Sequence, residues 1–301
     1  MIGIIRDFVK FTRLFRNRGP RHAIGIAILT IRARLMRIFD EKWERSIGLT
    51  FDESNVCLKS LRVASPNKQH GFSYVPCTSI AVRTLLDSIS TDLSRYCFID
   101  FGSGEGRSLI VASTYTFDQV IGVEFAEELH EAAVRNIEKA KPAAARSGKL
   151  QSIRMDAAIF DIPRKDCVLY FYNPFDEVVF RRVLMNIERA FSESRPKYYI
   201  VFHQTRSKLE ANNTKNARLL RAARFLKPCT IRFPTLWHRF LLGSQDLYIF
   251  ETIESTVDDL GSGHPREHSV IASCTGSPNA TCKRPSSGIL LWPGTSTHFP
   301  S

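Results

Sequence analysis

Short apolar runs alternate with helical patterns through the middle of the chain. Seven apolar runs predict strands, at residues 96–101, 119–124, 150–155, 166–172, 197–202, 230–233 and 246–251. Amphipathic spacing predicts helices at residues 78–89, 107–115, 126–140, 177–191 and 216–226. Such alternation is typical of a parallel sheet with helices on both faces. The sequence therefore predicts an α/β fold with a mostly parallel, doubly wound sheet of about seven strands.

The end of this pattern differs from the rest. No helical pattern separates the last two apolar runs, 230–233 and 246–251. A step between strands without a crossover helix indicates a hairpin. We therefore expect an antiparallel last edge of the sheet.

The flanking segments have different patterns. Residues 1–45 are predicted to be helical with a break at Gly19-Pro20, and residues 46–75 are irregular. From residue 255 the chain is rich in Ser, Thr, Gly and Pro, which favours a disordered tail. We therefore predict a basic helical N-terminal extension at residues 1–70, a ligand-binding domain at 71–254 and a disordered tail at 255–301.

A glycine-rich loop follows the first predicted strand. Asp100 lies at the end of that strand, and Gly102, Gly104 and Gly106 follow at alternate positions. Glycines there let a ligand approach the backbone at the carboxyl edge of a parallel sheet, where ligands bind. A dinucleotide fingerprint needs glycine at position 107, which is Arg107 here. This spacing disfavours a nucleotide-dependent oxidoreductase.

The loop, with Asp100 before it, resembles the first motif of the class I S-adenosylmethionine (SAM) dependent methyltransferases. The resemblance covers residues 71–253 and implies SAM as the cofactor. The order of Tyr74-Val-Pro, the GSGEGR loop, GVEF and NPF is also similar to bacterial methyltransferases of unassigned substrate. The cofactor-binding residues that it implies are Asp100, Gly102, Ser103, Gly104, Gly106, Glu124, Asp156 and Asn173.

Two of these residues have specific implied roles. Glu124 ends the second predicted strand, where a carboxylate can accept hydrogen bonds from ribose hydroxyls. Asp156 follows the third strand and is placed near the adenine amino group by the resemblance. Both acids have a simpler alternative as caps of the helix that follows.

The fourth predicted strand leads into Asn173-Pro174-Phe175, which the resemblance places against the transferred methyl group. The alternative is a plain Asn-Pro turn into a helix. His203 follows the fifth strand and is a candidate base, although a structural role is the alternative. We therefore predict Asn173, Pro174, Phe175 and His203 as the catalytic residues. The methyl acceptor is unassigned, and a small molecule and a protein both remain open.

The positive charge is concentrated at the N-terminus. Residues 1–39 contain nine basic side chains and one acid, which supply +8 of the formal net charge of +12. This segment has four interpretations: an anionic membrane surface, nucleic acid, an organelle transit sequence, or a helix pair packed on the domain. A non-catalytic Rossmann-like binding module, recruited through this segment, is the alternative to an enzyme.

The seven cysteines are scattered, and no spacing suggests a metal site or a disulfide framework. The longest apolar stretch, residues 22–31, is about half the length of a membrane span. We therefore expect a cytoplasmic protein without a bound metal, and leave open a peripheral membrane location.

Overall fold

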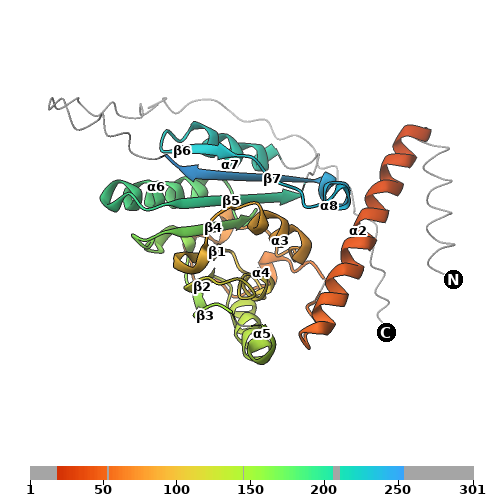
Figure 1. Cartoon of the computed structure of the whole chain (residues 1–301), viewed down its shortest axis with the longest axis horizontal. Helices are drawn as coiled ribbons and strands as arrows, with labels where there is room; N and C mark the ends of the chain where they lie inside the picture. The colour runs from red at the N-terminus through yellow and green to blue at the C-terminus, as the bar shows by residue number, and fades with distance from the viewer. Residues whose placement is uncertain (1–18, 53, 145, 206–210, 254–301) are drawn as a thin grey trace, which may run out of the picture. The chain divides into compact units, whose positions relative to one another are not determined.

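A seven-stranded mixed sheet forms the centre of the protein (Figure 1). The computed structural model describes residues 19–52, 54–144, 146–205 and 211–253. The strands lie in the order β3-β2-β1-β4-β5-β7-β6. Their bounds are β1 Cys97–Phe101, β2 Gln119–Glu124, β3 Lys149–Arg154, β4 Cys167–Tyr172, β5 Tyr198–Thr205, β6 Leu226–Cys229 and β7 Gln245–Thr252.

The pairing confirms the predicted fold class. The strands from β3 to β5 are parallel to one another, whereas β7 is antiparallel to both β5 and β6. All five residues of β1 are buried, as expected for a strand at the centre of a sheet that is covered on both faces.

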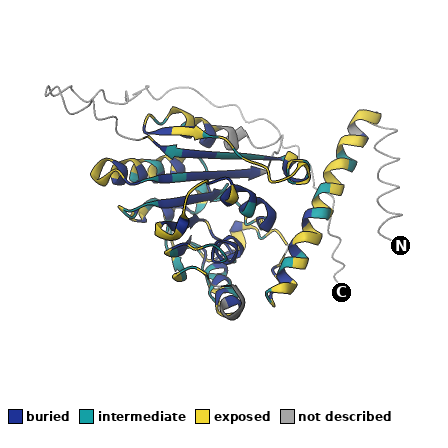
Figure 2. Ribbon diagram, viewed as in Figure 1, coloured by how far each residue is buried: buried dark blue, intermediate teal, exposed yellow. Residues whose placement is uncertain are grey.

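Helices cover both faces of the sheet. Their bounds are α2 Pro20–Ser46, α3 Ser79–Asp87, α4 Arg107–Ala112, α5 Glu127–Ala144, α6 Glu177–Ser194, α7 Ala211–Ala222 and α8 Leu236–Leu241. One apolar core joins α3, α4 and α5 to one face, and a second joins α6 and α7 to the other. Burial is almost continuous along the central strands β1, β2 and β4, whereas the edge strand β3 contains no fully buried residue (Figure 2).

The last edge of the sheet differs from the prediction in detail. The sixth strand is Leu226–Cys229 and not residues 230–233, and helix α7 ends at Ala222 instead of extending to residue 226. The short helix α8 lies between the last two strands, where no helix was predicted. Strand β6 contains Pro228, which an edge strand tolerates because a missing N–H need not break a ladder.

A division of the chain falls after Glu254. The predicted disordered tail, 255–301, and residues 1–18 lie outside the described residues. Residues 19–70 fold together with residues 71–253, because α2 packs on α3 and α8. None of the described helices is both long and apolar enough to cross a membrane.

A buried ion-pair network attaches α2 to the glycine loop. Arg107, the first residue of α4, extends its guanidinium towards α2, with Nη2 2.9 Å from Glu44 Oε1 and Nη1 3.4 Å from Asp40 Oδ2. All three side chains are almost completely buried. The guanidinium also donates to the Cys77 carbonyl (3.1 Å) and stacks over the Phe51 ring at 4.8 Å.

The same carboxylates organise the neighbouring backbone. Asp40 accepts hydrogen bonds from the Ser79 N–H (2.8 Å) and hydroxyl, which caps the start of α3 from another helix. Glu44 accepts from the Phe51 N–H at 3.3 Å. One of the four interpretations of the basic N-terminal segment was that it packs on the domain. This interpretation applies to the inner face of α2.

We expect Arg107→Met to lower the free energy of unfolding by about 3–5 kcal/mol, because it leaves two buried carboxylates without their cation. Urea denaturation followed by circular dichroism measures this change. The control is Arg37→Met, which removes a surface ion pair with Glu41 on the same helix (2.8 Å, side chains 63% and 45% exposed). That change is expected to cost less than about 1 kcal/mol. Equal losses of unfolding free energy in the two variants would contradict a stabilising role for the buried Arg107–Asp40–Glu44 network.

Candidate functional site

The loops that follow β1, β2, β3 and β4 meet at the carboxyl edge of the sheet, because these strands are parallel neighbours. The loop after β1 contains the three predicted glycines. Gly102, Gly104 and Gly106 have φ angles of 85°, 52° and 83°. This left-handed region favours glycine, and it turns the chain sharply into α4.

Two of the glycines also allow close packing above the loop. A Cβ atom at Gly102 would lie 2.5 Å from the Pro174 Cβ, and one at Gly104 would lie 2.2 Å from the Tyr74 ring. Side chains from two distant segments therefore rest directly on the loop backbone. Any residue larger than glycine at these positions would displace them.

Glu124 connects the end of β2 to the glycine loop. Its Oε2 accepts a hydrogen bond from the Gly104 N–H (2.8 Å), and its Oε1 accepts one from the Ala126 N–H (2.9 Å). The side chain is buried, and this burial raises the pKa of the carboxyl group. The bond to Ala126 lies in the turn before α5, which begins at Glu127, so the carboxylate fixes this turn and the glycine loop together and does not form the helix cap that was the alternative for Glu124.

Asp100 is a second buried carboxyl group beneath the same loop. The Ser108 hydroxyl donates to one of its oxygens, Oδ2. Burial, with a smaller contribution from the nearby Glu124 charge, raises the Asp100 pKa to about 7. Its other oxygen, Oδ1, has no hydrogen-bond partner among the described residues, and the same is true of Ser103 Oγ and Asn173 Oδ1.

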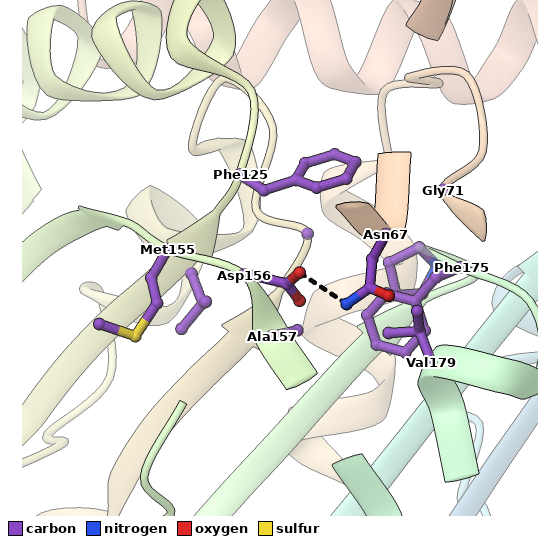
Figure 3. A pocket seen from close by; sticks show the side chains of 11 residues that line it. Asn67, Gly71, Phe125, Met155, Asp156, Ala157, Phe175 and Val179 are labelled. Carbon is purple, nitrogen blue, oxygen red and sulfur yellow. Dashed lines mark hydrogen bonds between the residues drawn. The ribbon is translucent and has the colours of Figure 1, made fainter. Parts of the chain in front are cut away.

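A small cavity of about 30 Å³ opens beside this loop (Figure 3). Its wall contains Gly102 and residues that follow the other three parallel strands: Phe125 after β2, Met155 and Asp156 after β3, and Phe175 after β4. Asn67 and Gly71, from the segment that precedes α3, complete the wall. Most of the wall is apolar. Asp156 and Asn67 are its polar groups, and their side chains point towards each other across it.

Asp156 is held by contacts within the protein. Its Oδ2 accepts from the Asn67 amide (2.7 Å) and from the Ser65 hydroxyl, and its Oδ1 accepts from the Ala158 N–H (2.8 Å). The latter bond caps the short turn at residues 157–159, which is the alternative predicted for this acid. Asp156 also lines the cavity, as the resemblance requires of an adenine-binding residue.

A segment before α3 closes one side of the cavity, and its individual residues were not among the predicted site residues. The Phe72 N–H donates to the Pro174 carbonyl (3.2 Å), and the Asp176 N–H donates to the His70 carbonyl (2.8 Å). These bonds pair the backbone around Gly71 with that around Phe175. Residues 65–72 contain no hydrophobic period, so only their Pro, Asn and Gly content signalled a turn.

The turn after β4 lies against the glycine loop. Asn173 has a φ of 43°, a left-handed conformation that asparagine tolerates better than most residues. Pro174 contacts Gly102, and Phe175 is buried against Phe171 at the cavity wall. The structure therefore brings Pro174 and Phe175 beside the glycine loop, with Asn173 in the same turn.

The structure does not support His203 as a base. The ring is fully buried, with Nδ1 2.9 Å from the Tyr170 hydroxyl and Nε2 2.6 Å from Gln245 Oε1. Both nitrogens are thus engaged, and burial lowers the His203 pKa to about 4. His203 was predicted to follow the fifth strand, but β5 extends to Thr205 and contains it, and its side chain joins β5 to β4 and β7 instead of lining the cavity.

No family model matches the chain, and no curated protein matches it. Similar solved structures include an RNA methyltransferase from Salinibacter ruber in complex with S-adenosylhomocysteine, which is 18% identical and has a TM-score of 0.37. This match covers 62% of the present chain and 100% of the other. A TehB-like SAM-dependent methyltransferase from Corynebacterium glutamicum is 17% identical over 58% of this chain and 88% of the other, with a TM-score of 0.37.

A third similar structure is a ribosomal protein L11 methylase from Lactobacillus delbrueckii subsp. bulgaricus. It is 12% identical, with a TM-score of 0.38, and the match covers 58% of this chain and 78% of the other.

We expect His203 to make stability depend on acid pH. Its folded-state pKa of about 4 lies below the usual 6.5, so its contribution is complete above pH 6.5 and is lost as the pH falls towards 4. The difference in unfolding free energy between wild type and His203→Gln should shrink over that interval. Thermal or urea unfolding at several pH values measures it.

Proposed function

We propose that this chain binds SAM at the carboxyl edge of its sheet and is a SAM-dependent methyltransferase. The observation that carries the proposal is a pair of buried carboxyl groups, Asp100 and Glu124, around a loop of left-handed glycines. Three oxygens beside the loop, from Asp100, Ser103 and Asn173, have no hydrogen-bond partner among the described residues. Buried acceptors of this kind suit a ligand that carries positive charge and N–H donors.

The charge of the site separates SAM from a dinucleotide. SAM carries a sulfonium and an ammonium group, whereas the pyrophosphate of NAD is an anion. Arg107 is the nearest cation in the sequence, and its guanidinium extends away to Asp40 and Glu44. A pyrophosphate on this loop would therefore face two buried acids and find Arg107 already occupied.

The residues fit the cofactor in their type and position. Gly102 and Gly104 admit a ligand close to the backbone, once Tyr74 and Pro174 move aside from the loop. Glu124 would face the ribose, and Asp156 with the apolar cavity wall would face the adenine ring. Bound SAM supplies an activated methyl group on a positively charged sulfur.

The acceptor side is formed by the turn after β4. The orphaned Asn173 Oδ1 can accept a hydrogen bond from the group that is to be methylated, and Pro174 fixes the turn. Alignment of a nucleophile with the methyl group supplies about 7–11 kcal/mol in such reactions. The acceptor, a small molecule or a protein, is not specified by these residues.

Calorimetry tests cofactor binding. We expect SAM and S-adenosylhomocysteine to bind the full chain, whereas NAD gives no heat. Glu124→Gln replaces the carboxylate, which accepts from the Gly104 N–H, by an amide with a single acceptor oxygen. Because the amide has fewer acceptors and no charge, the affinity of this variant for SAM should fall about tenfold or more. Glu131→Gln, which changes a half-exposed acid on α5, is the control and should bind as wild type does.

Binding of NAD in place of SAM would overturn the proposal. Transfer of a labelled methyl group to protein, RNA, lipid and small-molecule fractions then distinguishes an enzyme from a binding module. A chain that binds SAM and labels no fraction would support the module, recruited through its basic N-terminal segment.

We expect the affinity for SAM to depend on pH through Asp100. A cationic ligand favours the carboxylate form, and the pKa of about 7 means that this form is depleted below neutrality. From pH 8 to pH 6 the affinity of the wild type should fall relative to that of Asp100→Asn, approaching about tenfold per pH unit below the pKa. Calorimetry at pH 6, 7 and 8 measures the ratio, and a constant ratio would contradict this role.

A further inference from the structure

Helix α2 carries an apolar stripe that the fold leaves exposed. The stripe consists of Ile24, Ile28, Ile31 and Ile38, which together with Leu35 follow one another at intervals of three and four residues; Leu35 itself is partly buried and packs against the core around Met36. This spacing places them on one side of the helix. Ile24, Ile31 and Ile38 are 51%, 50% and 56% exposed, whereas Asp40 and Glu44 on the inner side are buried (Figure 2).

Helix α8 extends this apolar surface. Its first residues, Leu236 and Trp237, are 84% and 63% exposed. The Trp237 ring contacts Phe240 (centroids 5.5 Å apart), and the Arg32 guanidinium of α2 lies over that same Phe240 ring at 4.8 Å. The two helices therefore present adjacent apolar groups, which we call the α2–α8 face.

The charge around the α2–α8 face is mainly positive, and Glu41, which pairs with Arg37, is a half-exposed acid that borders it on α2. Neither residues 19–39 nor residues 226–245 contain an Asp or a Glu. Exposed arginines lie on both segments: Arg21, Arg34 and Arg37 on one, Arg232 and Arg239 on the other. Apolar side chains with a basic border, and a tryptophan at the edge, match the interface of an anionic bilayer.

Other occupants fit this face less well. A second copy of the chain would bring two mainly basic borders together, which is unfavourable because the arginines outnumber the exposed acids there. Nucleic acid would engage the arginines and leave the isoleucine stripe in water. An anionic lipid surface satisfies both the charge and the apolar groups.

We propose that the α2–α8 face docks this protein on an anionic membrane surface. The isoleucine stripe and Trp237 enter the level of the headgroups, while the arginines contact lipid phosphates. Helix α8 leads into β7, whose first residue Gln245 pairs with Thr205 at the carboxyl end of β5. Docking therefore brings the carboxyl edge of the sheet, where we propose that SAM binds, towards the lipid. The docking proposal itself does not depend on methyl transfer.

Vesicle co-sedimentation of the full chain tests this proposal. We expect binding to phosphatidylcholine vesicles that contain about 30% phosphatidylserine, weakening with salt, and much less binding to phosphatidylcholine alone. The double variant Leu236→Asp/Trp237→Asp should lower the partition coefficient roughly tenfold or more. These side chains are exposed, so the variant should fold, and circular dichroism checks this. Ile31→Asp tests the α2 stripe in the same way.

The matched control is Met185→Asp, which changes an apolar side chain that is 67% exposed on α6. It should bind vesicles as wild type does, and an equal loss of binding in this variant would overturn the proposal.

Absence of wild-type binding to anionic vesicles would overturn the proposal as well. A dimer in ultracentrifugation that the α8 variant dissociates, without vesicle binding, would identify a second copy as the occupant. A chain without residues 1–18 that binds where the full chain does not would identify those residues as the cover.

Discussion

The buried guanidinium of Arg107 is the interaction on which the architecture of the site depends. A charged group with almost no exposure is tolerated only when opposite charges and hydrogen bonds replace its water. Asp40 and Glu44 provide that compensation, and both belong to a helix more than sixty residues earlier in the chain. The network thereby fixes helix α2, the start of α3 and the end of the glycine loop relative to one another.

The same network determines the electrostatic character of the candidate site. Because Arg107 is neutralised on the side of α2, the two acids that remain beneath the loop, Asp100 and Glu124, are not paired with a cation there. Burial raises the pKa of each carboxyl group. A raised pKa means that the ionised form of the carboxyl group is unfavourable in this buried position. A cationic ligand relieves that cost, and an anionic ligand increases it. The identity of residue 107 thus bears on the ligand through charge as well as through the glycine spacing.

Local patterns predicted much of this fold, and contacts between distant segments account for what was missed. The central strands and the glycine loop are short, continuous signals, so the first five strands and Glu124 were located from sequence. Strand β6 was displaced by a few residues because Lys227 and Pro228 break its apolar run. A strand end also indicates the edge of a sheet but not which face a side chain takes. For this reason His203 was placed at the correct edge and given a role that its buried ring cannot perform.

The cavity wall gives a second example of this limit. Gly71 reaches the site through backbone pairing with Phe175 after β4, more than a hundred residues away, and Asn67 reaches it through a side-chain hydrogen bond to Asp156 after β3. Their own segment has no periodicity from which such pairing could be inferred. The partners of Arg107 were likewise invisible, since a charged residue at the start of a helix is usually solvated.

Helix α2 joins two regions of the molecule as a single rigid element. Its outer side carries the isoleucine stripe, and its inner side carries the two carboxylates that hold the residue directly after Gly106. Such an arrangement would couple the two regions thermodynamically: if the proposed partner shifts α2 when it binds, it would change the affinity of the loop for the proposed ligand. By reciprocity, a ligand on the loop then changes the affinity of α2 for that partner by the same factor. Through helix α2, binding of the proposed ligand at the carboxyl edge of the sheet and attachment of the proposed partner at the α2–α8 face would regulate each other.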